Sequence, residues 1–451
     1  MTTPYTVHTG DCRDVLRDYP ADHFDSIVSD PPYGLTFMGK GWDRGVPGVE
    51  FWQEALRVAK PGAHLLAFGG TRTFHRLTVA IEDAGWEIRD CMMWLYGSGF
   101  PKSHDVSKAI DRAVGAERQV LDERPAYGIG STGATFNGHA EGATAKTTAP
   151  ATPEAKQWEG WGTALKPAWE PVIVARKPLS GTVADNVLRY GTGALNIDGC
   201  RVGSGEDVVT FDRAPRTTAG GLYDLGTVVG VRQSTQGRWP ANVMHDGSAE
   251  VVAGFPVTAA AQASMRGERS GVVMDADWGG PNTLRGHNDA GGSAARFFYC
   301  AKASRTDRDE GCDHLPGFQG HEVVDRKEGS AGLNSPRAGA GRTISNVREF
   351  GGAQHTEDVK LAKNFHPTVK PTDLMRYLCR LVTPPAGLVL DPFCGSGSTG
   401  KAALLEGLRF VGVDLDPAHV AIAEARCQFA VDTVAEQAAA AEAPGAQLTL
   451  F

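Results

Sequence analysis

The sequence predicts an α/β fold built on a doubly wound, Rossmann-like sheet that a long loop-rich segment interrupts. Apolar runs with strand character alternate with helical patterns at both ends of the chain, which is typical of a mainly parallel sheet. A glycine-rich turn at residues 395–400 fits G-x-G-x-x-G, and Asp414 ends the next apolar run. This is roughly the spacing of a nucleotide-binding fold. Residues 180–360, in contrast, are rich in glycine and broken into short pieces.

The composition is that of an ordinary globular protein with an acidic balance. The 451 residues are 41% hydrophobic and 22% charged, enough for two or three domains with a sizeable core. The formal net charge of -8 gives no global attraction to nucleic acid, so DNA binding would need local basic patches or delivery by a partner. Because the sequence has neither a basic-then-apolar N-terminal signal nor an apolar run of membrane-spanning length, we expect a cytoplasmic protein.

The cysteines argue against a metal or disulfide framework. The 8 cysteines are scattered and form no C-x-x-C pair, which fits a reducing compartment. Cys300, Cys312 and His314 could contribute to a metal site, but we expect no metal.

The N-terminal part is expected to alternate strands and helices. The expected strands are residues 5–8, 24–28, 63–68, 86–96 and 169–175; the expected helices are residues 13–19, 51–59 and 74–84, with a turn at residues 60–62. Between these elements, residues 115–163 contain mostly Gly, Ala and Thr with few apolar anchors. This composition predicts a flexible insertion.

Regular structure is expected to resume only near the C-terminus. We expect residues 180–360 to form a separate loop-rich unit with one strand-like run at 295–301. The later elements are a helix at 373–382 with Thr372 as its N-cap, strands at 388–390 and 410–414, a helix ending at 406, and a last helix from 417 to about 441. The expected units are therefore 1–179, 180–360, 361–432 and a flexible tail at 433–451.

The Asp30-Pro31-Pro32-Tyr33 loop is the first candidate site. It follows the strand at residues 24–28, and two prolines cannot continue a sheet ladder, so the strand must end there. The loop places a carboxylate, a rigid carbonyl and an aromatic ring close together, which suits a planar base that carries an amino group. A strand-terminating turn is the simpler interpretation of D-P-P alone, and Tyr33 with Gly34 favours the functional one.

The glycine-rich turn is the second candidate site, and by itself it would also fit a dehydrogenase. Asp391 and Phe393 precede the turn at the end of a strand, where a carboxylate would repel a pyrophosphate but suit a cationic sulfonium. The Asp-Pro-Pro-Tyr loop also has no use in hydride transfer. Together these features favour S-adenosylmethionine over a dinucleotide.

The combination resembles the amino-methylating DNA methyltransferases of the N6-adenine/N4-cytosine family, in the circularly permuted order with the Asp-Pro-Pro-Tyr motif first. The segments that follow the family's order are residues 10–12, 30–33, 366–371, 391–400 and 412–414, within a match over roughly 5–110, 160–180 and 360–430. The resemblance implies an enzyme of a bacterial or phage-infected bacterial cell, with a target-recognition region at 180–360. Asp rather than Ser at the first motif position favours adenine, and cytosine N4 stays an alternative.

The resemblance also implies roles for single residues. Asp30 and the Pro31 carbonyl, followed by Pro32, would accept hydrogen bonds from the two N–H groups of a flipped-out adenine. These bonds would localise the lone pair on the amino nitrogen. Tyr33, with Phe37 or Trp42, would stack on the base; core packing explains Phe37 and Trp42 equally well. The implied cofactor-binding residues are Asp11, Cys12, Thr368, Lys370, Pro371, Asp391, Pro392, Phe393, Gly395, Gly397, Thr399 and Asp414. Asp11 would meet the cofactor's adenine and Asp414 its ribose, and Lys370 could instead be a surface lysine.

Two further stretches suggest partners. Base edges and phosphates are contacted by Arg, Gln, Asn and Lys, which predicts DNA reading by Arg232, Gln236, Arg238, Arg337, Arg342 and Arg348, although solvated loops would have the same composition. The tail resembles the short peptide that docks bacterial replication and repair proteins on the DNA sliding clamp, through Gln447, Leu448, Leu450 and Phe451. Such a tether would raise the effective concentration of an acidic enzyme on DNA. A tail that folds back onto its own core is the alternative.

Two other functions share part of this pattern. A catalytically silent DNA-binding protein tethered to the replication clamp would keep the fold, but the intact Asp30 and Asp414 count against it. Methylation of RNA or of protein amides would use the same chemistry on a different substrate.

Overall fold

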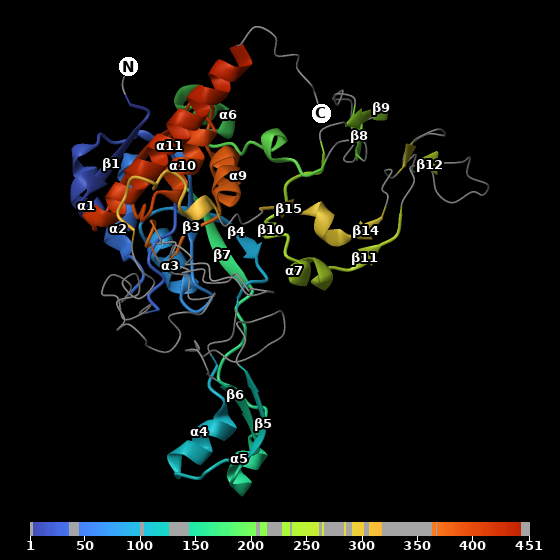
Figure 1. Cartoon of the computed structure of the whole chain (residues 1–451). Helices are drawn as coiled ribbons and strands as arrows, with labels where there is room; N and C mark the ends of the chain where they lie inside the picture. The colour runs from blue at the N-terminus through green and yellow to red at the C-terminus, as the bar shows by residue number, and fades with distance from the viewer. Residues whose placement is uncertain are drawn as a thin grey trace.

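In the part of the chain that the structure describes, a central sheet of nine strands organises the fold (Figure 1). The computed structural model describes residues 3–35, 45–99, 103–125, 144–203, 208–213, 228–234, 237–260, 264–265, 284–285, 291–301, 306–317, 363–366 and 368–442. Along the sheet the strands are β1 (Tyr5–Thr9), β17 (Arg409–Asp414), β16 (Leu388–Asp391), β2 (Phe24–Ser29), β3 (Ala59–Phe68), β7 (Trp169–Arg176), β4 (Glu87–Leu95), β10 (Val243–His245) and β15 (Tyr299–Cys300). All neighbours pair in parallel except β7, which is antiparallel to both β3 and β4.

Helices cover both faces of the sheet, as a doubly wound fold requires. One face carries α9 (Thr372–Val382), α10 (Ser398–Leu405) and α11 (Pro417–Glu442); the other carries α2 (Val49–Val58) and α3 (Phe74–Asp83), with α1 (Cys12–Val15) nearby. Strand β3 shows the division, because Leu66 and Phe68 pack with the first group while Leu65 and Ala67 pack with the second. The predicted α/β fold class is confirmed.

The two ends of the chain meet at the centre of the sheet. Strand β16 pairs with β2 through Val389 and Ser26 and through Leu390 and Ile27, although more than 350 positions separate them in the sequence. Since parallel strands end at the same edge, the loop after β2 and the loop after β16 leave the sheet side by side.

Three local predictions were wrong. Residues 60–62 are not a turn but part of β3, where the β2–β3 register shifts between Phe24 and Ser26. The helix expected at 13–19 divides into α1 and a 3-10 turn, η1 (Leu16–Asp18). Thr372 is the first helical residue of α9 rather than its N-cap: Pro371 takes that position, and the Thr372 N–H donates to the distant Asp307 carboxylate over 3.0 Å.

Where the structure describes it, the segment expected to be a flexible insertion contains regular structure, while residues 126–143 lie outside the described part. A projection formed by α4 (Val106–Ala113), β5 (Val120–Pro125), β6 (Thr144–Thr148) and α5 (Pro153–Gln157) extends from the carboxyl end of β4 (Figure 1). Its centre is polar: the buried Asp111 carboxylate accepts bonds from Arg118, from the Ala151 N–H and from the Thr152 N–H and hydroxyl. The hydrogen bonds of this buried carboxylate therefore hold the projection together where the sequence has few apolar residues.

Part of the loop-rich segment belongs to the central sheet. Strands β10 and β15 extend the sheet beyond β4, and α6 (Val183–Tyr190) packs near β3. The strand-like run at 295–301 is a 3-10 helix, η6 (Ala294–Phe297), followed by β15. The remaining short elements are η4 (Asp198–Cys200), β8 (Val208–Arg213), β9 (Val228–Ser234), α7 (Ala249–Gly254), β11 (Val257–Thr258), β12 (Ser264–Met265), β13 (Leu284–Arg285), β14 (Gly292–Ser293) and η7 (Thr306–Arg308).

Among the described residues, the structure has no helix whose length and apolarity would let it cross a membrane.

Candidate functional site

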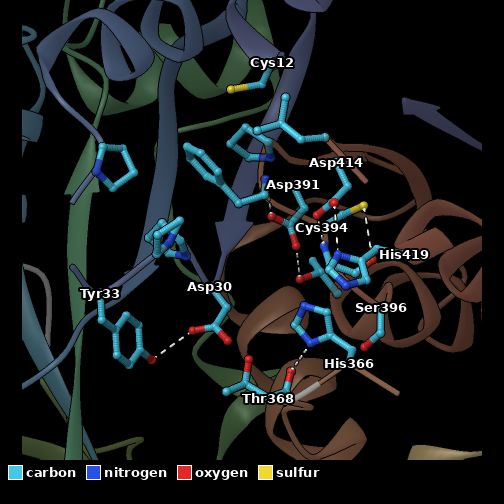
Figure 2. Close-up of a pocket in the computed structure, with 18 of the residues that line it drawn as sticks. Cys12, Asp30, Tyr33, His366, Thr368, Asp391, Cys394, Ser396, Asp414 and His419 are labelled. Atoms are coloured by element: carbon cyan, nitrogen blue, oxygen red, sulfur yellow. Dashed lines mark hydrogen bonds and ion pairs between the residues drawn. The ribbon is translucent and has the colours of Figure 1, made fainter. Parts of the chain in front are cut away.

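A pocket of about 450 Å³ opens at the edge of the sheet where β2 and β16 end. Its walls come from both ends of the chain: the Asp-Pro-Pro-Tyr loop contributes one side, and the loops after β16 and β17 contribute the other (Figure 2). The predicted residues that line it are Asp11, Cys12, Asp30, Pro31, Pro32, Tyr33, Thr368, Lys370, Asp391, Pro392, Phe393, Gly395, Thr399 and Asp414. Pro371 and Gly397 are not among the residues that line it.

Asp30 is the centre of a polar cluster on the β2 side. Its Oδ1 accepts the Tyr33 hydroxyl over 2.8 Å, and its Oδ2 pairs with the Lys370 ammonium over 2.8 Å. Glu170, at the start of β7, lies 3.0 Å from the same hydroxyl and 3.2 Å from the same ammonium. We call these four residues the Asp30 cluster.

Lys370 is not a surface lysine. Its side chain is only 8% exposed, and its ammonium lies over the rings of Tyr33 and Phe68, 5.3 Å and 4.8 Å from their centroids. Burial would lower the pKa of this ammonium, but the carboxylates of Asp30 and Glu170 outweigh burial and raise it. Lys370 is therefore a charged member of the Asp30 cluster, and its contact with a cofactor stays a prediction.

Asp391 connects the two halves of the site. The Ser29 and Thr399 hydroxyls each donate to it over 2.6 Å, and the Phe393 N–H donates over 3.1 Å. The side chain is almost fully buried, and burial raises the pKa of its carboxyl to about 7 despite these bonds. Asp391 thus fixes the end of β2, the loop after β16 and the start of α10 relative to one another.

The glycine-rich turn is held by Asp414 at the end of β17. The Asp414 carboxylate accepts the N–H groups of Gly395 and Asp416, each over 2.9 Å, and faces the His419 ring over 3.2 Å (Figure 2). Burial would raise the pKa of the Asp414 carboxyl, but the contacts with His419 and the Asp416 N–H outweigh burial and lower it. His366 packs so closely on Gly395 that a Cβ there would come within 2.8 Å of its Nε2.

Gly397 is required for helix packing rather than for contact with a ligand. Its φ is +73°, and a Cβ there would lie 2.7 Å from the Cα of Ala423 on α11. Gly407 has a similar φ of +71° but no atom within 4 Å of such a Cβ. We therefore expect Gly397→Ala to lower the free energy of unfolding by about 1–3 kcal/mol more than Gly407→Ala does. Both variants strain the backbone, but only the Gly397 variant also places a methyl group against α11.

Urea unfolding of the two glycine variants and the unchanged chain would measure this difference. Equal loss of stability in both variants would show that α11 moves freely to accept the methyl group.

Asp11 already has a cationic partner. It caps α1 through the Arg13 N–H and binds the Arg13 guanidinium over 2.6 Å. Arg13 in turn lies over the Phe51 ring, 4.3 Å from its centroid, and Phe51 packs against Phe393 at 5.7 Å. This part of the pocket wall is therefore a carboxylate beside two aromatic rings, which fits the predicted contact with a nucleoside.

Sequence reasoning missed several residues that line the pocket. These are Arg13, Phe51, Glu170, His366, Ser396 and His419. Position gave a signal for His366, which lies in a motif segment, and for Ser396, which lies in the glycine-rich turn. Glu170 begins a segment that resembles one of the family's intermediate strands, but its entry into the site depends on the antiparallel return of β7.

Several predicted residues lie outside the described part of the chain. Those residues are Phe37, Trp42, Gln236, Arg337, Arg342, Arg348, Gln447, Leu448, Leu450 and Phe451. Arg232 falls within β9, but its side chain is outside the description. Arg238 is described, and its guanidinium lies over the Phe297 ring, 4.2 Å from the centroid. Roles in base stacking, DNA reading and clamp binding stay predictions for all of them.

Parts of the chain are similar to known DNA methyltransferases. Residues 293–425 match the N6/N4 methyltransferase family model, described as DNA methylase. The chain is 26% identical to the type II methyltransferase M.HindIII of Haemophilus influenzae over 152 residues, which cover 33% of this chain and 38% of that protein. It is 34% identical over 74 residues to the DNA adenine methyltransferase YhdJ of Escherichia coli, covering 16% of this chain and 25% of that protein. The matches thus span well under half of these relatives.

Solved structures give weaker similarity. The M1.HpyAVI–SAM complex is 11% identical with a TM-score of 0.34, covering 94% of this chain and 99% of that one. The cytosine-N4-specific PvuII methyltransferase is 12% identical with a TM-score of 0.39, covering 94% and 87%. The family match includes His366, Asp391 and Asp414, whereas Asp30 lies outside it.

Proposed function

Because this chain carries a domain of the N6-adenine/N4-cytosine DNA methylase family, we propose that it transfers a methyl group from S-adenosylmethionine to the exocyclic N6 of adenine in DNA. The observation that carries the proposal is the meeting of two distant segments. The Asp-Pro-Pro-Tyr loop and the glycine-rich turn, at opposite ends of the chain, form walls of one pocket.

The charges of the pocket fit a cationic cofactor. The described lining includes six carboxylates, those of Asp11, Asp30, Glu170, Asp391, Asp414 and Asp416, and only two cationic side chains, Arg13 and Lys370. Both cations are already paired with carboxylates. Such a lining would repel a pyrophosphate and attract a sulfonium. When bound, S-adenosylmethionine supplies an activated methyl group; Asp414 would hold its ribose, and Asp11 with Phe51 would hold its adenine.

The β2 side of the pocket fits the target base. The amino group of adenine is a poor nucleophile because its lone pair is delocalised into the ring. Asp30 and the Pro31 carbonyl can accept hydrogen bonds from its two N–H groups, and these bonds draw the nitrogen toward tetrahedral geometry. Tyr33 offers a ring for stacking once the base has left the duplex. Positioning and electrostatics by these residues would supply the rate enhancement.

Adenine is favoured over cytosine by the first motif residue. Asp30 occupies the position where a Ser-Pro-Pro-Tyr form would have serine, and one relative is named a DNA adenine methyltransferase. Methylation of cytosine N4 is the alternative, since the matched family includes both chemistries.

The test is methylation of unmethylated plasmid DNA by the purified chain with labelled S-adenosylmethionine, followed by nucleoside mass spectrometry. The proposal expects N6-methyladenine. N4-methylcytosine alone would change the target base. A folded protein that binds the cofactor and DNA but methylates neither would favour the silent DNA-binding alternative.

Asp391 gives cofactor binding a predictable pH dependence. Burial raises the pKa of its carboxyl to about 7, so in the free protein the group is mostly neutral at pH 6 and charged at pH 8. A sulfonium in the pocket favours the charged form, so binding lowers the pKa and releases a proton. The affinity for S-adenosylmethionine should therefore increase about tenfold from pH 6 to pH 8.

Calorimetric titration of the cofactor at several pH values would measure the effect, and Asp391→Asn should remove it. A pH dependence that persists in Asp391→Asn would assign the proton to another group.

A further inference from the structure

We propose that Glu170 is a positioning residue that takes the Lys370 ammonium from Asp30 when the target amino group enters the pocket. The inference rests on the proposed function and concerns the same site. It starts from a conflict: the carboxylate needed by the base is already bound to two donors.

Both oxygens of Asp30 are engaged before any base arrives. Oδ1 accepts the Tyr33 hydroxyl and Oδ2 accepts the Lys370 ammonium, each over 2.8 Å. A carboxylate oxygen can accept a further bond, but an ammonium in contact with it draws its electron density away. Asp30 is a better acceptor for the neutral N–H of a base once Lys370 has moved from it.

Glu170 is a second acceptor for the same two donors. Its Oε2 lies 3.0 Å from the Tyr33 hydroxyl and 3.2 Å from the Lys370 ammonium. Because Glu170 already contacts both donors, each donor keeps an anionic partner when it leaves Asp30. This exchange of partners needs no rearrangement of the backbone, because both distances are already short.

The surroundings of Lys370 leave little of its side chain in contact with solvent. Its side chain is 8% exposed and its ammonium faces the rings of Tyr33 and Phe68. An ammonium buried in this way is strongly disfavoured without an anion beside it. If Glu170 were neutral, Lys370 would stay on Asp30, and the base would have to compete with a full ion pair.

The position of Glu170 suits a fixed acceptor. It is the second residue of β7, paired with Trp94 of β4 in an antiparallel ladder, and its side chain is only 21% exposed. A carboxylate at the sheet edge can receive the ammonium without moving its own backbone, so only Lys370 has to change place.

Glu170→Gln tests the inference, because it keeps the shape and removes the charge. We expect kcat for DNA methylation to fall at least tenfold, with the dissociation constant for S-adenosylmethionine changing much less than kcat and the unfolding midpoint unchanged. Glu170→Asp, which restores the charge, should recover part of the rate. Glu87→Gln is the matched control, since Glu87 also lies on this strand pair and forms an ion pair, with Arg176 over 2.7 Å, away from the pocket lining.

A double variant shows whether Glu170 acts through Lys370. Lys370→Gln removes the ammonium, so adding Glu170→Gln to it should lower kcat little further. If the two residues acted independently, the losses in kcat of the two single variants would multiply. Three results would each overturn the inference: an unchanged kcat in Glu170→Gln, losses in the double variant that multiply in full, or a loss of cofactor affinity as large as the loss in kcat. If the unchanged protein methylates no DNA, the proposed function fails first; if it methylates DNA and Glu170→Gln does so equally well, only the inference fails.

Discussion

Replacing Asp30 by alanine should abolish methyl transfer to DNA while leaving the binding of S-adenosylmethionine largely intact. Asp30 provides the charged acceptor for the amino group that attacks the methyl carbon. Removing one such preorganised electrostatic contact typically costs about 10²–10³ in kcat. Steady-state kinetics with a DNA substrate, together with calorimetric titration of the cofactor, would measure the two effects separately.

The contacts of Asp30 explain why the cofactor side should survive. Its side chain bonds to Tyr33 and Lys370, whereas the glycine-rich turn is held by Asp414, and the loop after β16 by Asp391. In the alanine variant the Lys370 ammonium keeps Glu170 as its anion. The fold is therefore expected to stay intact.

Two further variants sharpen this prediction. Asp30→Asn keeps the shape of the side chain and should also be inactive if the charge is required. Asp22→Asn removes a more exposed carboxylate that pairs with Lys177 on the surface and should retain full activity. Undiminished methylation by Asp30→Ala would refute the assignment of the Asp-Pro-Pro-Tyr loop to the target base.

The features that sequence reasoning identified are those encoded by neighbouring residues. The Asp-Pro-Pro-Tyr loop must end a strand because proline cannot continue the ladder, and β2 does end at Ser29. Strands β16 and β17 and helices α10 and α11 lie close to their expected bounds, because short apolar runs and helical periodicity are local signals. The meeting of the two loops then follows from the parallel sheet.

The features that it missed depend on contacts between distant segments. Thr372 looked like a helix cap, but the carboxylate that binds its N–H is that of Asp307, 65 positions earlier. The projection looked disordered because its anchor, Asp111, is a charged residue whose partners lie as far away as Thr152. Glu170 reaches the Asp30 cluster only because β7 runs antiparallel. None of these partners can be predicted from the local pattern around either residue.

Replacing Arg426 by methionine should have the largest effect on stability, at about 1–3 kcal/mol for each buried acceptor that loses its donor. Arg426 lies on α11, is 0% exposed, and burial lowers the pKa of its guanidinium. One nitrogen donates to the Ser396 carbonyl over 2.7 Å and to the Ser396 and Ser398 hydroxyls; the other donates to the Asp307 carbonyl over 3.1 Å. Methionine would fill most of the volume but leave these buried acceptors without a donor.

The loss should also reach the cofactor side, because Ser396 belongs to the glycine-rich turn and lines the pocket. Arg426 and the neighbouring Lys401, which pairs with Asp307 and Glu310, together bind residues 307–310 to α10 and α11. Removing the guanidinium should therefore loosen this segment and the turn together and weaken the binding of S-adenosylmethionine.

Arg409→Met, at an exposed position on β17 with one 3.3 Å bond to the Ala386 carbonyl, is the matched control and should change stability by less than about 1 kcal/mol. Urea unfolding of both variants, with cofactor titration of each, measures the difference. Equal stability of Arg426→Met and Arg409→Met would show that the carbonyls of Ser396 and Asp307 find other donors, and that the turn does not depend on α11.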